Sequence, residues 1–165
     1  MFKVSEKTKN MEQKTKVIAE GGKQDLIITR EFDLPLESLF KAYTEPEILE
    51  QWMGTKVLKL ESKKHGSYRI ETKDPKGNVA FEASGVIHEF IHNRKITRTF
   101  EMEHTPFGVQ LEVYEFEKVT DETSKLNMHV IYESVAQRDQ VLKLPFAQGI
   151  NRAHNRLQEI VNKLK

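Results

Sequence analysis

The sequence predicts an α+β fold in which a curved antiparallel sheet of about six to seven strands wraps around one long C-terminal helix. Three observations predict it. Residues 57–133 form short runs of alternating or β-rich residues separated by turn residues, which is typical of antiparallel strands with short connections. Residues 135–165 return to the helical spacing of apolar side chains. No linker or internal repeat interrupts the chain, so we expect a single domain over residues 17–165.

The chain is expected to begin with a flexible arm over residues 1–16, which are polar, charged and aperiodic. The first strand is expected at residues 26–32, where β-branched residues are frequent. Residues 1–16 carry several lysines and no apolar stretch behind them, so they do not form a secretory signal.

Two short helices should follow this strand. Pro35 suits the first turn of the first helix, because its fixed φ matches the helical value. Proline has no backbone N–H, but the N–H groups of a first turn have no partner within the helix, so no hydrogen bond is lost. Thr44 and Glu47 have the spacing of a capping box, which predicts the start of the second helix. Gly54 should end it.

The remaining strands follow from alternation between apolar and polar residues. They are expected at residues 57–60, 67–70, 79–91, 94–103, 108–119 and 125–133. The terminal helix carries an apolar stripe made of Phe146, Ile150, Ala153, Leu157, Ile160 and Leu164. Pro145 should kink or break this helical region, because proline removes a backbone hydrogen bond and clashes with the preceding turn.

The composition excludes several classes of protein. Lys and Arg number 26 against 25 Asp and Glu, a net charge of +1, whereas nucleic-acid-binding proteins usually carry a basic excess. Cysteine is absent, which excludes disulfides, thiolate nucleophiles and cysteine-built metal sites. No stretch is long and apolar enough to insert into a membrane. We therefore expect a cytoplasmic protein that does not bind nucleic acid.

One string satisfies a metal-binding pattern. His88-Glu89-Phe90-Ile91-His92 matches the H-E-x-x-H pattern of zinc proteases, which requires a helix so that both histidines reach one ion. The flanking residues predict a strand, on which positions i and i+4 lie about 13 Å apart, too far to share a metal. We therefore expect no metal site and no cofactor.

The sequence also predicts the wall of an apolar cavity between the sheet and the terminal helix. Candidate ligand-binding residues are Trp52, Tyr68, Phe81, Phe100, Phe116, His129, Tyr132, Phe146, Gly149 and Ile150. Gly149 is included because a missing side chain on the helix would leave room. The competing interpretation is that these aromatic residues form ordinary core.

Polar groups that could orient a ligand are His129, Arg98 and Arg69. Each lies on a predicted strand, where a charged side chain is typical of the surface because charges are seldom buried unpaired. No spacing identifies a catalytic pair, so no catalytic residue is assigned.

Several short motifs occur together in one order along most of the chain. They are ITREFDLP at 28–35, LFKAYTEP at 39–46, QWMG at 51–54, GSYR at 66–69, GVIHEF at 85–90, TFE at 99–101 and QGI at 148–150. In these motifs the chain resembles the activator of heat-shock protein 90 ATPase homologue (AHSA-type) family, within the START-like (Bet v 1-like, SRPBCC) helix-grip superfamily. It departs from the family's usual turns at His92-Asn93 and at residues 63–66.

The resemblance implies a helix-grip fold with a cavity, and it leaves three functions open. The first is binding of a small apolar ligand without catalysis. The second is interaction with a chaperone, which ranks lower because only about 25 residues precede the domain, where chaperone activators carry a further domain. The third is a cyclase-like or hydrolase-like enzyme acting on an apolar substrate, for which His129 is the candidate polar group.

Overall fold

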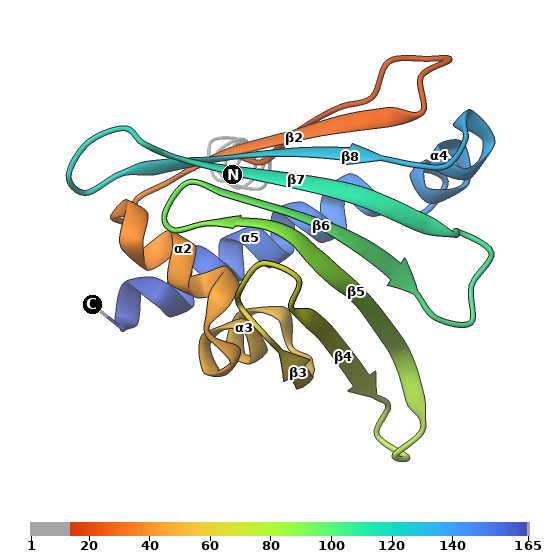
Figure 1. Cartoon of the computed structure of the whole chain (residues 1–165), viewed down its shortest axis with the longest axis horizontal. Coiled ribbons are helices and arrows are strands. Elements are labelled where there is room, and N and C mark those ends of the chain that lie inside the picture. The colour runs from red at the N-terminus through yellow and green to blue at the C-terminus, as the bar shows by residue number, and fades with distance from the viewer. Residues whose placement is uncertain (1–13, 165) are drawn as a thin grey trace, which may run out of the picture.

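The structure is a computed structural model that describes residues 14–164, which form one antiparallel sheet and four helices (Figure 1). The strands are β1 (Lys16–Ile18), β2 (Asp25–Phe32), β3 (Lys56–Leu60), β4 (Ser67–Lys73), β5 (Val79–Ile91), β6 (Lys95–Met102), β7 (Val109–Lys118) and β8 (Ser124–Ile131). The helices are α2 (Leu36–Thr44), α3 (Pro46–Met53), α4 (Val135–Leu142) and α5 (Phe146–Lys163).

The sheet has eight strands in the order β1-β2-β8-β7-β6-β5-β4-β3, and every neighbouring pair is antiparallel. It curves around α5, and α2 and α3 pack beside that helix (Figure 1). The predicted helix-grip architecture is confirmed. The sheet has one strand more than predicted. This strand is β1, which pairs with β2 and is too short, at three residues, to show an alternation of apolar and polar side chains.

Pro35 is the N-cap of α2, one residue before the first turn in which it was expected, and the second short helix also begins differently from the prediction. Thr44 is the last residue of α2, and its hydroxyl donates to the carbonyl oxygen of Phe40 (3.0 Å). The N-cap of α3 is Glu45, whose side chain makes no capping hydrogen bond, and Pro46 occupies the first turn. The predicted capping box is therefore wrong. An N-cap residue must have a non-helical backbone, whereas Thr44 still belongs to α2. Gly54 ends α3 in the left-handed conformation (φ 65°), as predicted.

Helix α5 packs its apolar stripe against the sheet. Pro145 separates α4 from α5, so the predicted interruption is a break between two helices. Leu157 and Val161 in the C-terminal half of α5 are buried, whereas Leu164 at the end of the stripe is exposed. The C-terminal half therefore anchors the helix on the sheet.

The predicted arm differs from the structure at its end. Residues 1–13 lie outside the described residues. Thr15 is buried and Lys16 begins β1, so these two residues belong to the fold. Thr15 is held by contacts to a helix more than one hundred residues away in the sequence, which a local sequence pattern does not show.

A buried polar cluster joins Thr15 and β2 to α5. The backbone N–H of Thr15 donates to Asn151 Oδ1 (3.0 Å), and its hydroxyl lies 2.9 Å from His154 Nδ1. Arg30 Nη1 donates to Thr15 Oγ1 (3.0 Å), and Tyr43 Oη lies 3.3 Å from His154 Nε2. These hydrogen bonds satisfy polar groups that would otherwise be costly to bury.

His154 is the titratable centre of this cluster. It is fully buried, and burial together with the positive charge of Arg30 lowers the pKa of its imidazole to about 3. The ring is therefore neutral in the folded protein at every pH above that value.

We predict that His154 makes the stability of the protein fall as the pH falls. Between about pH 6.5 and about pH 3 the unfolded chain binds a proton at this residue and the folded chain does not, so protonation favours unfolding. This residue alone should lower the free energy of unfolding by about 2 kcal/mol at about pH 5 relative to about pH 7. Urea titrations at the two pH values measure the difference.

The variant His154→Gln should lose this part of the pH dependence, whatever its own stability. His88→Gln is the matched control, because His88 is exposed on β5. A pH dependence in His154→Gln equal to that of the unmodified protein would contradict the prediction.

Candidate functional site

A cavity of about 230 Å³ lies between the concave face of the sheet and helix α5. Most of its wall is apolar and comes from α3, the central strands and α5. Its apolar residues include Ile28, Leu49, Ile70, Met128, Val130 and Ala153. The cavity exceeds the roughly 150 Å³ that holds a benzene molecule in an engineered protein core. It is somewhat smaller than the roughly 300–1,000 Å³ of sites for drug-sized ligands.

The structure brings together most of the residues predicted from the sequence. Trp52, Tyr68, Phe100, Tyr132, Phe146 and Ile150 all line the cavity. They come from α3, β4, β6, the residue after β8, and α5. The cavity therefore collects side chains that lie far apart in the sequence.

Three apolar or small predicted residues do not line the cavity. Phe116 is buried under α2, where its ring packs edge to face with those of Phe40 and Tyr43. Phe81 is half-buried near the start of β5 and does not reach the cavity. Gly149 is exposed on α5, and a Cβ atom added there would meet nothing within 4 Å, so it leaves no room inside the protein.

His129 points to the outer face of the sheet. On β8 the residues alternate between buried and half-buried, and His129 is on the half-buried side. Its Nε2 lies 2.7 Å from Asp25 Oδ2, and its side chain is 43% exposed. His129 is therefore not a group that could act on a molecule in the cavity.

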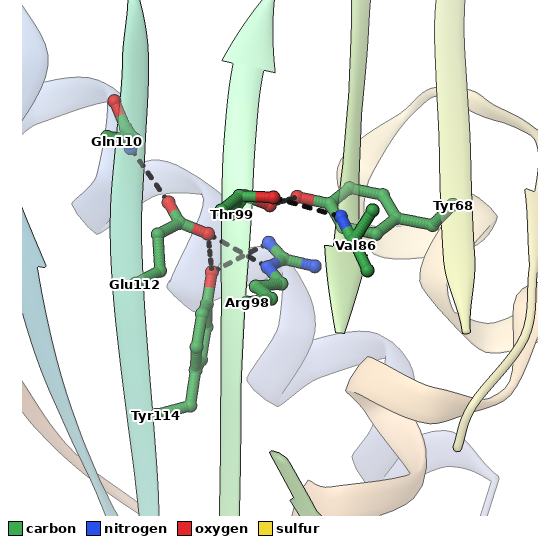
Figure 2. Close-up of polar contacts among 7 residues, drawn as sticks. All are labelled: Tyr68, Val86, Arg98, Thr99, Gln110, Glu112 and Tyr114. Carbon is green, nitrogen blue, oxygen red and sulfur yellow. Dashed lines mark hydrogen bonds and ion pairs between the residues drawn. The ribbon is translucent and has the colours of Figure 1, made fainter. Parts of the chain in front are cut away.

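The cavity contains a buried ion pair. Arg98 on β6 lies directly opposite Glu112 on β7, and Arg98 Nε donates to Glu112 Oε1 (2.8 Å) (Figure 2). Tyr114 Oη donates to the same carboxylate oxygen (3.0 Å), and Gln110 Nε2 donates to the other (2.8 Å). The expectation that Arg98 lies on the surface is therefore wrong. Its charge can be buried because Glu112 and Tyr114 supply hydrogen-bonding partners.

The guanidinium of Arg98 also contacts two aromatic rings. It lies 4.5 Å from the ring centroid of Tyr68 and 4.8 Å from that of Tyr114. Such cation–π contacts favour a positive charge that has lost its water. The hydroxyl of Tyr68 donates to the carbonyl oxygen of Thr99 (2.6 Å), which fixes the ring (Figure 2).

Gly85 makes the position of the Tyr68 ring possible. A Cβ atom on Gly85 would lie 2.7 Å from the hydroxyl oxygen of Tyr68 and closer still to the backbone of Thr99. A side chain at this position would displace the ring, because real Cβ atoms do not approach other heavy atoms so closely. The sequence signal for this contact is a glycine inside a strand, which marks a close approach of another chain segment.

The phenols beside the ion pair remain protonated. Burial raises the pKa of Tyr68 and raises that of Tyr114 well above its usual value. Glu112 accepts three hydrogen bonds from its neighbours, so most of its capacity to accept hydrogen bonds is already used. This arrangement suits a fixed polar wall and does not suit a base that takes a proton from a substrate.

The H-E-x-x-H string lies on a strand, as expected. Residues 88–91 belong to β5, and His92 lies in the turn that follows, with its ring against that of Phe40. Among residues 14–164 no group of three or more His, Asp or Glu side chains has the arrangement of a metal site. In the same part of the chain, no helix has the length and apolarity needed to cross a membrane.

We predict that breaking the ion pair destabilises the protein more than breaking an exposed pair. Glu112→Gln leaves the charge of Arg98 without a counter-ion in the cavity wall and should cost about 3–5 kcal/mol in the free energy of unfolding. The control is Glu159→Gln, which removes the partner of Lys163 in a pair whose side chains are 69% and 72% exposed, and should cost less than about 1 kcal/mol. Urea unfolding of both variants measures these costs.

The double variant Arg98→Met with Glu112→Leu removes both charges and should recover much of the lost stability. Equal losses in Glu112→Gln and Glu159→Gln would contradict a buried pair.

Comparisons with known proteins agree with this fold. A protein from Rhodobacter sphaeroides is 21% identical, with a TM-score of 0.80 over 90% of this chain and 99% of its own. A protein from Mycobacterium smegmatis is 21% identical, with a TM-score of 0.78 over 88% of this chain and 95% of its own. One from Arthrobacter aurescens is 14% identical, with a TM-score of 0.79 over 90% of this chain and 91% of its own. At these identities the likeness concerns the fold alone.

A search of curated proteins found no significant match. The family described as Activator of Hsp90 ATPase homolog 1-like protein matches residues 33–162, which include α2, α3, nearly all of α5 and every cavity-lining residue except Ile28. The chain therefore belongs to the Activator of Hsp90 ATPase homolog 1-like family.

Proposed function

We propose that this protein binds a small, mostly apolar molecule in the cavity between the sheet and α5. The observation that carries the proposal is the cavity of about 230 Å³ inside a domain with an otherwise packed core. Protein interiors seldom contain voids larger than a water molecule. A binding role explains why the space is kept.

The composition of the wall supports an apolar ligand. Aromatic and aliphatic side chains from both the sheet and α5 surround the space, and polar groups are confined mainly to the cluster around Arg98 and Glu112. Sites for small molecules typically combine a largely apolar wall with a few fixed polar groups.

The other two functions have weaker support. Catalysis would need a polar group free to exchange a proton, whereas Glu112 already accepts three hydrogen bonds and His129 lies on the outer face. A chaperone partner is suggested by the description of the family. Such a partner would contact the surface and would not require the cavity. A chaperone ATPase assay with a cavity-filled variant therefore separates it from ligand binding.

We predict that naphthalene-sized apolar compounds raise the melting temperature of the protein. A ligand that binds only the folded state stabilises it by about 2.7 kcal/mol at one hundred times its dissociation constant. For a domain of this size the melting temperature should rise by roughly 5–10 °C. Native mass spectrometry of the freshly purified protein provides an independent test through any bound mass that is lost on denaturation.

Ala153→Phe should abolish the shift, because Ala153 lies in the cavity wall on α5 and a phenyl ring would fill much of the space. Ala147→Phe is the matched control, since Ala147 is exposed on the same helix. The proposal is wrong if no compound in the series shifts the melting temperature, or if both variants retain an equal shift.

A further inference from the structure

We propose that helix α4 is a lid over the cavity, which Arg138 holds closed and which must move for a ligand to enter or leave. The inference rests on the proposed function and specifies how access to the same cavity is controlled. Three observations carry it: the position of α4 at an exposed part of the cavity wall, the sparse packing of this helix, and the buried arginine that ties it to the rest of the fold.

One part of the cavity wall reaches the surface beside α4. Leu144, which follows α4, lines the cavity and is 46% exposed, and Phe107 and Gly108 line it from the loop between β6 and β7. A Cβ atom on Gly108 would lie 2.5 Å from Gln137 Nε2 and closer still to Glu133 Oε2, so this loop touches the start of α4. Figure 1 shows α4 and the loop at the same end of the sheet. Their contact therefore closes one end of the cavity.

Helix α4 is only lightly packed on the rest of the molecule. It makes sparse contacts with the other helices and strands, whereas α3 packs along α5. Of its eight residues only Arg138 and Val141 are buried. Irregular residues separate it from both neighbours in the chain, 132–134 after β8 and 143–145 before α5. A short helix with few buried contacts between two irregular segments can move as a unit while the sheet stays folded.

Arg138 ties α4 to the segment that joins β1 to β2. Its Nη1 donates to the backbone carbonyl oxygens of Glu20 (2.6 Å) and Asp25 (3.1 Å), and its Nη2 donates to Asp139 Oδ1 (3.0 Å). The side chain is 3% exposed, so these bonds are shielded from water. Hydrogen bonds from a charged donor are stronger than those between neutral groups. Val141, one turn further along, is buried and lines the cavity. Arg138 is therefore a positioning residue that keeps Val141 over the cavity.

Exchange of naphthalene in a stopped-flow experiment tests the role of Arg138. Trp52 is the only tryptophan of the chain and lines the cavity, so its fluorescence reports entry and release of the compound. Arg138→Met should raise both rates by roughly 10-fold, the factor that the loss of one hydrogen bond from a charged donor supplies, with little change in the dissociation constant. Both rates change together because the lid opens in each direction of exchange.

Arg156→Met is the matched control for Arg138→Met. Arg156 also donates to a backbone carbonyl oxygen, that of Gln51 (3.2 Å), but it lies on α5 outside the cavity wall. Its exchange rates should equal those of the unmodified protein. Equal rates in the two methionine variants, or a change in the dissociation constant without a change in the release rate, would contradict the role of Arg138.

A disulfide tests the lid in a protein that keeps Arg138. Gly108→Cys with Gln137→Cys places one cysteine on each side of the contact between the loop and α4, in a chain that has no other cysteine. Gly108 has a positive φ (73°), which strains a cysteine there, but the oxidised and reduced forms share that strain. The oxidised protein should exchange naphthalene at least about 10-fold more slowly than the same protein after reduction, because the lid cannot open.

The single variant Gln137→Cys is the control for the disulfide, and reduction should not change its rates. Equal rates before and after reduction in the protein with both cysteines, once thiol titration has verified the bond, would overturn the lid. The ligand would then enter elsewhere, and the proposed function would stand. If naphthalene changes neither the fluorescence of Trp52 nor the melting temperature of the unmodified protein, the proposed function itself is overturned.

Discussion

The contact between α5 and the concave face of the sheet holds the structure together through some side chains of the helix and leaves space beside others. Leu157 and Val161 are buried in the core, and His154 and Asn151 bond Thr15 beside the sheet edge. Phe146, Ile150 and Ala153 line the cavity instead. The helix thus anchors the fold through one set of side chains and covers the cavity with another, so the space can persist without loss of the fold.

The buried pair of Arg98 and Glu112 solves the problem of placing polar groups in this apolar space. Each charge alone would be expensive to bury, but the two lie opposite one another on adjacent strands and are bonded further by Tyr114 and Gln110. Because its partners are already in place, the guanidinium of Arg98 has a fixed position in the cavity wall.

Much of the fold could be predicted from local patterns. Alternation located the strands from β2 to β8, helical spacing located α5, and Pro145 and Gly54 marked helix ends correctly. Local patterns failed where the deciding contact was distant. The strand β1 exists because it pairs with β2, and Thr44 did not cap α3 because α2 extends through it. For the site, the sequence correctly predicted six of the residues that line the cavity. Phe116 and Phe81 were predicted on the same grounds and do not line it, so an aromatic residue on a strand is not sufficient evidence of a cavity position.

The sequence by itself determined the order of the elements, the family, and the apolar character of the side chains that face the helix, because these depend on residue type and spacing. Only the tertiary structure decided which inward residues border the cavity and that Arg98 is buried. A charged residue on a strand is usually solvated, and its burial depends on an opposite charge on the neighbouring strand. That neighbour is set by the register between β6 and β7, which places Arg98 opposite Glu112 across 13 intervening residues of chain.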